Sequence, residues 1–149
     1  MNLRPKIALY EPDIPQNTAA IIRTCACLGA DLEIIEPCGF LFSDKRFKRV
    51  VMDYMDEKLI KFYQSSDEFF KSKRDKRVIL LTTKSAKSYT AFKFENNDTL
   101  LFGRESAGVP DHVPVSYTHL RAHETLMNLV CRLLLEKRCC SEVDCARWL

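Results

Sequence analysis

Apolar and polar positions along the chain follow two periods, that of short buried strands and that of amphipathic helices. Runs of four or five mostly apolar residues predict strands of a parallel sheet, which is buried on both faces. Apolar residues three and four positions apart predict the helices. The expected strands are Lys6–Tyr10, Asp31–Ile35, Leu59–Phe62, Arg77–Thr82 and Thr99–Phe102, and the expected helices are Asn17–Leu28, Asp44–Met52 and Ser66–Lys73. This alternation predicts an α/β fold.

Two of the expected helices carry a polar residue where an N-cap belongs. Asn17 precedes the apolar-periodic stretch of the first helix, so we expect it to be that helix's N-cap. Ser65 and Glu68 have the spacing of a capping box for the third.

Polar loops follow two of the buried strands. The first, Glu11–Arg23, contains two prolines that keep the backbone extended, and we expect it to direct Asn17 and Arg23 at one site. In the second, Gly103 and Gly108 flank an Arg, a Glu and a Ser, and both glycines can adopt unusual backbone angles. Open parallel sheets bind ligands outside the carboxyl ends of their strands. The two loops are therefore the candidate site.

Together with the continuation through residues 31–46, these two loops resemble the SpoU/TrmH branch of the SPOUT RNA 2′-O-methyltransferases. The resemblance runs from about Lys6 to Val113 without a gap in order or spacing. It implies a SPOUT-type α/β knot with helices on both faces of an open parallel sheet. It also implies S-adenosylmethionine as cofactor, tRNA as partner, and methyl transfer to a ribose 2′-hydroxyl, with the wobble cytidine or uridine as target.

The resemblance also implies a catalytic role for three residues. Arg23 would engage the ribose 2′-hydroxyl or an adjacent phosphate, Asn17 would hold the first loop, and Glu105 is the carboxylate of the second. A ribose hydroxyl is a poor nucleophile at neutral pH, so a cation that stabilises the developing oxyanion suits the reaction. The alternatives are a surface ion pair for Arg23 and, for Glu105, a carboxylate that orders its loop by binding backbone amides.

The cofactor residues implied by the resemblance lie at the ends of two strands. They are Leu81, Thr82, Thr83, Gly103 and Gly108. A simple strand end is the alternative for the two threonines. The sequence contains no Gly-rich phosphate fingerprint, Walker loop or metal-binding motif, so no metal is expected.

The formal net charge of +3 is modest, but two segments concentrate the cations. We expect the first cluster to bind RNA through its cations, which are Lys45, Arg46, Lys48 and Arg49. A solvated helix face is an equal alternative for the second cluster, which consists of Lys71, Lys73, Arg74, Lys76 and Arg77.

Composition changes near Pro114. All four glycines precede it, whereas four of the seven cysteines and the only tryptophan follow it. The third motif of the resembled family is missing here, and the stretch from Val115 to Lys137 resembles a translated sequencing-library adapter. We expect residues 1–114 to be a truncated SPOUT methyltransferase domain that lacks its knot-forming segment, and residues 115–149 to be a tail foreign to the family. A C-terminal helix of this chain's own is the alternative. The tail's histidines and cysteines match no zinc-finger spacing.

We expect a cytoplasmic protein with reduced thiols, because the chain has no run of roughly 20 apolar residues and no apolar leader. The resemblance implies a homodimer, but we expect this chain, with its foreign tail, neither to form that dimer nor to bind the cofactor well.

Three other functions stay open. They are another SpoU-type rRNA or tRNA 2′-O-methyltransferase, an RNA-binding relative without catalysis, and a small nucleotide-binding or regulatory domain.

Overall fold

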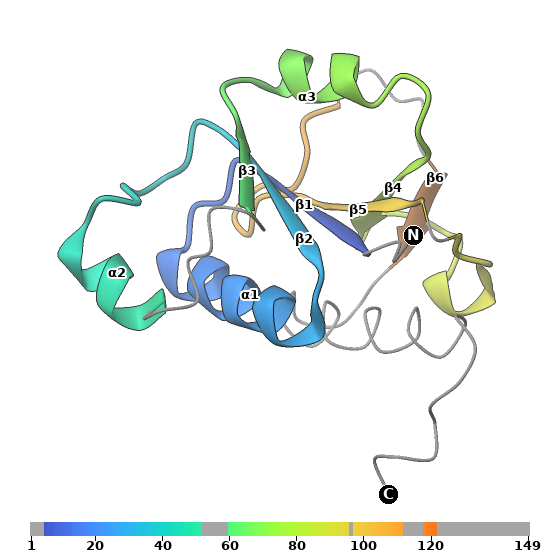
Figure 1. The fold of residues 1–149 in the computed structure, drawn as a ribbon. Coiled ribbons are helices and arrows are strands. Elements are labelled where there is room, and N and C mark those ends of the chain that lie inside the picture. Colours follow the sequence, from blue (N-terminus) through green and yellow to red (C-terminus); the bar gives the residue numbers. More distant parts are fainter. Residues whose placement is uncertain (1–4, 52–59, 96, 112–117, 122–149) are drawn as a thin grey trace, which may run out of the picture.

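The computed structural model describes residues 5–51, 60–95, 97–111 and 118–121. Six parallel strands form one sheet in the order β3-β2-β1-β5-β4-β6 (Figure 1). The strands are β1 Lys6–Tyr10, β2 Asp31–Ile35, β3 Ile60–Tyr63, β4 Val78–Thr82, β5 Thr99–Phe102 and β6 Thr118–Arg121. The helices are α1 Pro15–Leu28, α2 Lys45–Val51 and α3 Ser66–Ser72, with a 3-10 turn at Tyr89–Ala91.

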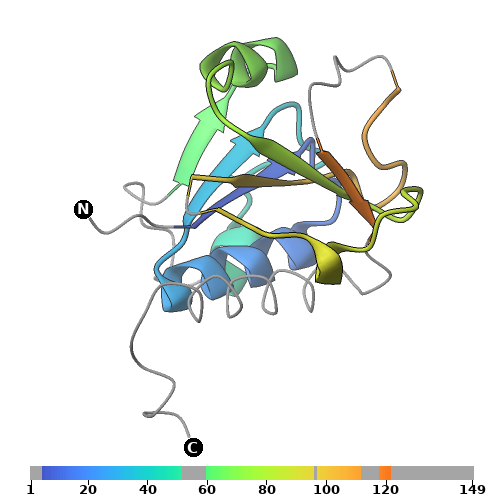
Figure 2. The ribbon, with the colours of Figure 1, turned by 90° about the vertical axis from the view of Figure 1, so that its right-hand side faces the viewer.

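Helices cover both faces of this sheet, as the resemblance implied. Alternate residues of β1 point to opposite faces, so Ile7 and Leu9 pack in the core with α1 and α2, and Ala8 and Tyr10 pack on the face that α3 covers. Figures 1 and 2 show α1 on one side of the sheet and α3 on the other. The α/β class and the doubly covered parallel sheet are confirmed.

Local sequence signals predicted most element ends well, with one error. β1, β2 and β5 have the predicted bounds. Asn17 is not the N-cap of α1, because the helix begins two residues earlier at Pro15, and Ile14 occupies the N-cap position without a side-chain hydrogen bond. Proline fits the first turn of a helix because its missing N–H would have no partner there. The capping box is confirmed, since the Glu68 N–H donates to Ser65 Oγ at 3.3 Å.

The strand β6 was not expected, because it lies within residues 115–149, which the sequence analysis interpreted as a tail foreign to the family. It runs parallel to β4, with Ile79 opposite Thr118 and Leu81 opposite Leu120, and the Leu120 side chain is fully buried. The rest of the proposed foreign tail, the missing knot-forming segment and the alternative C-terminal helix lie outside the described residues. The boundary expected near Pro114 therefore stays a prediction.

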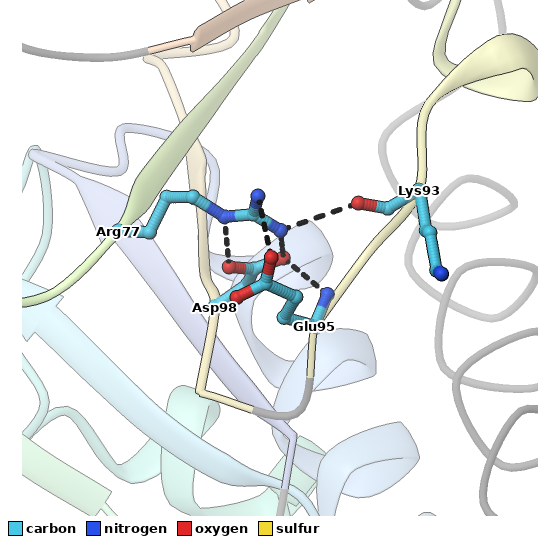
Figure 3. A network of polar contacts seen from close by, with 4 residues as sticks. All are labelled: Arg77, Lys93, Glu95 and Asp98. Atoms are coloured by element: carbon cyan, nitrogen blue, oxygen red, sulfur yellow. Dashed lines mark hydrogen bonds and ion pairs between the residues drawn. The ribbon is translucent and has the colours of Figure 1, made fainter.

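A bidentate ion pair joins the segments that lead into β4 and β5 (Figure 3). Arg77 Nε and Nη2 each lie 2.6 Å from a carboxylate oxygen of the buried Asp98. Asp98 also accepts from the Glu95 N–H at 2.7 Å, and Arg77 donates to the Lys93 carbonyl at 3.2 Å. The two strands are thus held in register at their amino ends, and their carboxyl ends form one edge.

The second basic cluster is not a continuous cationic surface. Arg77 is committed to Asp98, and Lys73 is buried with its Nζ 2.8 Å from Glu33 Oε1 in β2. Its three other cations are exposed; they are Lys71, Arg74 and Lys76.

Candidate functional site

The loop after β5 is closed on itself. The Gly108 N–H donates to the Arg104 carbonyl at 2.9 Å, and the Arg104 N–H donates to the Gly108 carbonyl at 3.3 Å. Gly108 has a φ of 71°, which favours glycine. A Cβ at Gly103 would lie 2.7 Å from the Gly108 carbonyl carbon, so only glycine fits without moving the backbone. Both predicted glycines are therefore required by the shape of this loop.

The loop after β1 is bound to the loop after β5 through Arg104. Its Nε donates to the Glu11 carbonyl at 3.2 Å, and its Nη2 lies 2.9 Å from Glu11 Oε2. Glu11 has a φ of 41°, a left-handed conformation that non-glycine residues rarely adopt. Arg104 thus fixes both the backbone and the side chain of this residue.

A second set of contacts joins the same loops around Asp13. The Asp13 N–H donates to Glu105 Oε2 at 3.2 Å, and the Ser106 hydroxyl donates to the Asp13 carboxylate. Hydrogen bonds with Glu105 and Ser106 lower the pKa of Asp13 to about 2. Burial, together with the neighbouring Asp13, raises the pKa of Glu105. Glu105 is therefore the member of this carboxyl pair that holds a proton more readily.

Glu105 accepts a hydrogen bond from a backbone amide of the first loop, the kind of contact that its alternative role expected. Its Oε2 binds the Asp13 amide. The Glu105 and Asp13 side chains also share a hydrogen bond, so this carboxyl pair joins the two loops at the edge of the cleft.

The segment after β2 packs against the loop that follows β1. The Gly39 N–H donates to the Pro12 carbonyl at 2.9 Å, and a Cβ at Gly39 would lie 2.9 Å from Asp13 Cα. Cys38 lies beside them, and burial and the carboxylates of Glu36, Glu11 and Glu105 raise its thiol pKa to about 12. Cys38 is therefore a protonated, unreactive thiol at neutral pH. Among the described residues, Cys25, Cys27 and Cys38 form no disulfide.

A cleft of about 830 Å³ opens at the carboxyl ends of β4 and β5. This volume lies within the range of small-molecule binding sites. The cleft brings together seven of the residues that the resemblance implied, which are Asn17, Leu81, Thr82, Thr83, Gly103, Glu105 and Gly108.

Arg23 does not line this cleft. It is exposed on α1, six residues after Asn17, which places it about 9 Å further along the helix axis and about 120° around it. The expectation that Asn17 and Arg23 point at one site is therefore not met in the cleft. The four cations of the first basic cluster lie on α2, exposed and also outside the cleft.

Sequence reasoning missed several residues that line the cleft. The principal ones are Leu80, Lys84, Ser85, Val109, Asp111 and His119. Lys84 and Ser85 directly follow the implied Thr82 and Thr83, so extending that loop would have found them. His119 lies on the unexpected strand β6; Ser85 donates to its carbonyl at 3.0 Å, and its Nε2 has no hydrogen-bond partner among the described residues. The sequence analysis had set this residue aside with the expected foreign tail.

Within the described ranges, no group of three or more His, Cys, Asp or Glu side chains could hold a metal ion. Within the same ranges, no helix has the length and apolar character needed to cross a membrane.

Residues 4–121 match the sequence profile of the SpoU rRNA Methylase family, which is well over half of the chain. The chain belongs to the SpoU methylase family. A tRNA (cytidine(34)-2'-O)-methyltransferase of Beijerinckia indica is 47% identical to this SpoU-family chain over 112 residues, which cover 74% of the chain and 70% of that relative.

Solved structures of SpoU methylases have the same fold. A structure described as giving insights into the 2-OH methylation of C/U34 on tRNA superposes with a TM-score of 0.82 at 31% identity, covering 91% of this chain and 94% of that one. An AdoMet-bound rRNA methyltransferase from Sinorhizobium meliloti superposes with a TM-score of 0.77 at 18% identity, covering 94% of this chain and 57% of that one. At that identity the second likeness shows the fold alone.

Proposed function

We propose that this SpoU-family chain represents an S-adenosylmethionine-dependent enzyme that methylates the ribose 2′-hydroxyl of nucleotide 34 in tRNA. One observation carries the proposal. The two loops that resemble this family meet at one cleft, joined by Arg104 to Glu11 and by Glu105 to Asp13. The named activity of the Beijerinckia indica relative gives the reaction and the nucleotide.

The cleft residues fit S-adenosylmethionine. The walls contributed by Leu80, Leu81, Phe102 and Val109 are apolar and suit a purine ring. The Glu105 carboxyl group lines the cleft, and a carboxyl oxygen there can accept a hydrogen bond from a ribose hydroxyl or an ammonium group of the cofactor. S-adenosylmethionine supplies an electrophilic methyl group on a sulfonium cation.

The ribose oxygen attacks the sulfonium methyl, its proton passes to solvent and S-adenosylhomocysteine leaves. Arg23, which lies outside the cleft, is proposed to assist by holding a phosphate of the RNA beside the reacting ribose. Its exposed position on α1 leaves the guanidinium accessible to RNA. A guanidinium stabilises a developing oxyanion or holds an adjacent phosphate through paired donors. Asn17, in the first turn of the same helix, lines the cleft and would hold the loop there.

The tail is part of the proposal. Residues 115–149 would not supply the third motif, so a chimera in which a relative's natural C-terminal segment replaces them should be the active form. We further propose that this chimera is a cytoplasmic homodimer and that the chain with its own tail is not. Sedimentation of both proteins tests this, because a stable dimer of the unaltered chain would show that its tail supports the assembly.

Methyl transfer tests the function directly. The chimera should transfer label from methyl-labelled S-adenosylmethionine to total tRNA, and nuclease digestion should recover the label on a ribose. Arg23→Ala should lower turnover far more than it weakens tRNA binding. Label on a base would overturn the reaction assigned. Binding of tRNA without methyl transfer would favour the RNA-binding relative without catalysis.

A further inference from the structure

An exposed surface beside α2 combines apolar side chains with cations. We call it the apolar–basic surface, and it consists of Leu41, Phe62, Lys45, Arg46, Lys48 and Arg49. Leu41 is 74% exposed and Phe62 is 41% exposed, so both present apolar surface to solvent.

A cluster of four aromatic rings holds this surface in place. Phe42 lies 5.0 Å from Phe62, 4.9 Å from Phe47 and 5.0 Å from Phe40, measured between ring centroids. Phe47 is a buried residue of α2, and Phe62 belongs to β3, the end strand of the sheet. The helix and the strand are thereby connected, and part of the Phe62 ring is left open to solvent.

The charge of this surface is positive. Four of the seven residues of α2 are exposed cations, and none of them forms an ion pair with a described residue. The nearby Asp44 accepts a hydrogen bond from the Arg46 backbone N–H at 2.9 Å, not from its guanidinium. The four side chains are therefore available to anions.

Backbone contacts connect the surface to the cleft. The segment that leads into α2 packs against the first loop, since the Gly39 N–H donates to the Pro12 carbonyl at 2.9 Å. Asp13, the next residue, is bound in turn to Glu105, which lines the cleft. In Figure 1, α2 lies beside the first turn of α1, the helix that places Asn17 in the cleft.

We infer that the apolar–basic surface binds a single-stranded segment of the RNA substrate, with phosphates on the α2 cations and a base stacked on Phe62. This inference rests on the proposed function and adds the place and manner of RNA binding. Cations beside an exposed aromatic ring match the alternation of phosphate and base in a single strand. A duplex offers phosphates but no free base face, so the single-stranded form should be preferred.

Fluorescence anisotropy of the full 149-residue chain tests this without any cofactor. The probe is a labelled oligouridylate, with a duplex RNA of equal length for comparison. Phe62→Ala should weaken oligouridylate binding about tenfold or more and leave the salt dependence unchanged. The double variant Lys48→Gln/Arg49→Gln should instead lower the slope of log affinity against log salt by about 0.7 for each phosphate that is no longer bound. Leu41→Ser, in an exposed loop, supplies a second apolar variant if Phe62→Ala folds poorly.

The matched control is Lys71→Gln/Arg74→Gln, which removes two exposed cations outside this surface and should leave affinity and salt slope unchanged. The inference is overturned if the chain does not bind oligouridylate at low salt, if duplex binds equally well, or if neither Phe62→Ala nor Leu41→Ser weakens binding. Binding to anionic vesicles instead of RNA, or Phe62-dependent self-association in sedimentation, would assign the surface to a membrane or to a second copy.

The inference and the proposed function can fail separately. If the chimera methylates tRNA and the variants of the apolar–basic surface do not affect RNA binding, only this inference fails. If RNA binding depends on them and methyl transfer is absent, only the proposed function fails.

Discussion

Arg104 and Glu11, which lie 93 positions apart, are joined twice, through the Glu11 carbonyl at 3.2 Å and through its carboxylate at 2.9 Å. Arg104 supports the left-handed backbone of Glu11 from outside its own segment, and the contacts of Asp13 with Glu105 and Ser106 join the same two loops. The geometry of the cleft therefore depends on the pairing of the two loops.

Replacing Arg104 tests this dependence. In the chimera, Arg104→Met should lower turnover on the order of tenfold to a hundredfold, because a small displacement of a binding loop misplaces the reactants. The free energy of unfolding should change by less than about 1 kcal/mol, as for other partly exposed ion pairs. Arg74→Met, an exposed position outside the cleft and outside the apolar–basic surface, is the control for turnover. An unchanged turnover for Arg104→Met would show that the loop is held by other residues.

Alanine substitutions at Gly103 and Gly29 allow the effect of a close contact to be measured apart from the effect of backbone strain. Gly103→Ala would place a Cβ 2.7 Å from the Gly108 backbone, whereas Gly29→Ala meets nothing within 4 Å and only strains a φ of 65°. Both changes should destabilise the fold, Gly29→Ala by roughly 1–2 kcal/mol. Only Gly103→Ala should abolish cofactor binding by the chimera. Calorimetric titration of both variants decides, and equal cofactor affinities would contradict the tight loop.

The raised pKa of Glu105 predicts a pH-dependent effect of Glu105→Gln. A carboxyl group whose pKa is raised in the folded state stabilises the fold below its ordinary value of 4.5, and this contribution is lost as pH rises through the raised pKa. Glutamine stays neutral and can still accept from the Asp13 N–H. The variant should therefore gain stability relative to the unaltered chain between pH 4 and pH 7. Urea midpoints at the two pH values measure this, and a relative loss at pH 7 would contradict it.

Removing one partner of the buried ion pair between Lys73 and Glu33 should cost more unfolding free energy than removing both. Lys73→Met leaves a carboxylate buried without its cation and should cost about 3–5 kcal/mol of unfolding free energy. The double variant Lys73→Met/Glu33→Leu removes both charges and should recover most of that loss. Urea unfolding of the three proteins provides the comparison. Additive losses in the double variant would show that the packing of the side chains, and not charge pairing, dominates.

Local patterns predicted the fold because the strands are short apolar runs with clear polar boundaries. β1, β2 and β5 have the expected residues, and Ser65 caps α3 as its spacing indicated. The predicted start of α1 was wrong because the proline rule for a helix's first turn outweighed the preference for a polar cap. The strand β6 was missed because its residues were assigned to a foreign tail, although Leu120 is buried in the core and β6 pairs with β4.

The candidate site was predictable where residues adjoin a strand end, and less so where tertiary structure decides. Gly103, Glu105 and Thr82 follow β5 or form the end of β4, so a parallel sheet brings them together. Arg23 is exposed on a helix, and its six-residue spacing from Asn17 already places it about 120° around that helix, so the sequence alone argued against one shared site. The hydrogen bonds from Arg104 and Ser106 across to the first loop join residues far apart in the chain, so no local pattern encodes them.

The central claim is that this cleft holds S-adenosylmethionine and needs a third segment that residues 115–149 do not supply. Calorimetric titration of S-adenosylmethionine into the unaltered chain and into the chimera tests it most directly. Removing two hydrogen bonds worth about 1 kcal/mol each weakens affinity about thirtyfold. The chimera should bind S-adenosylmethionine measurably, and the unaltered chain should bind it at least about thirtyfold more weakly. Equal affinity in both proteins, or none in either, would contradict it.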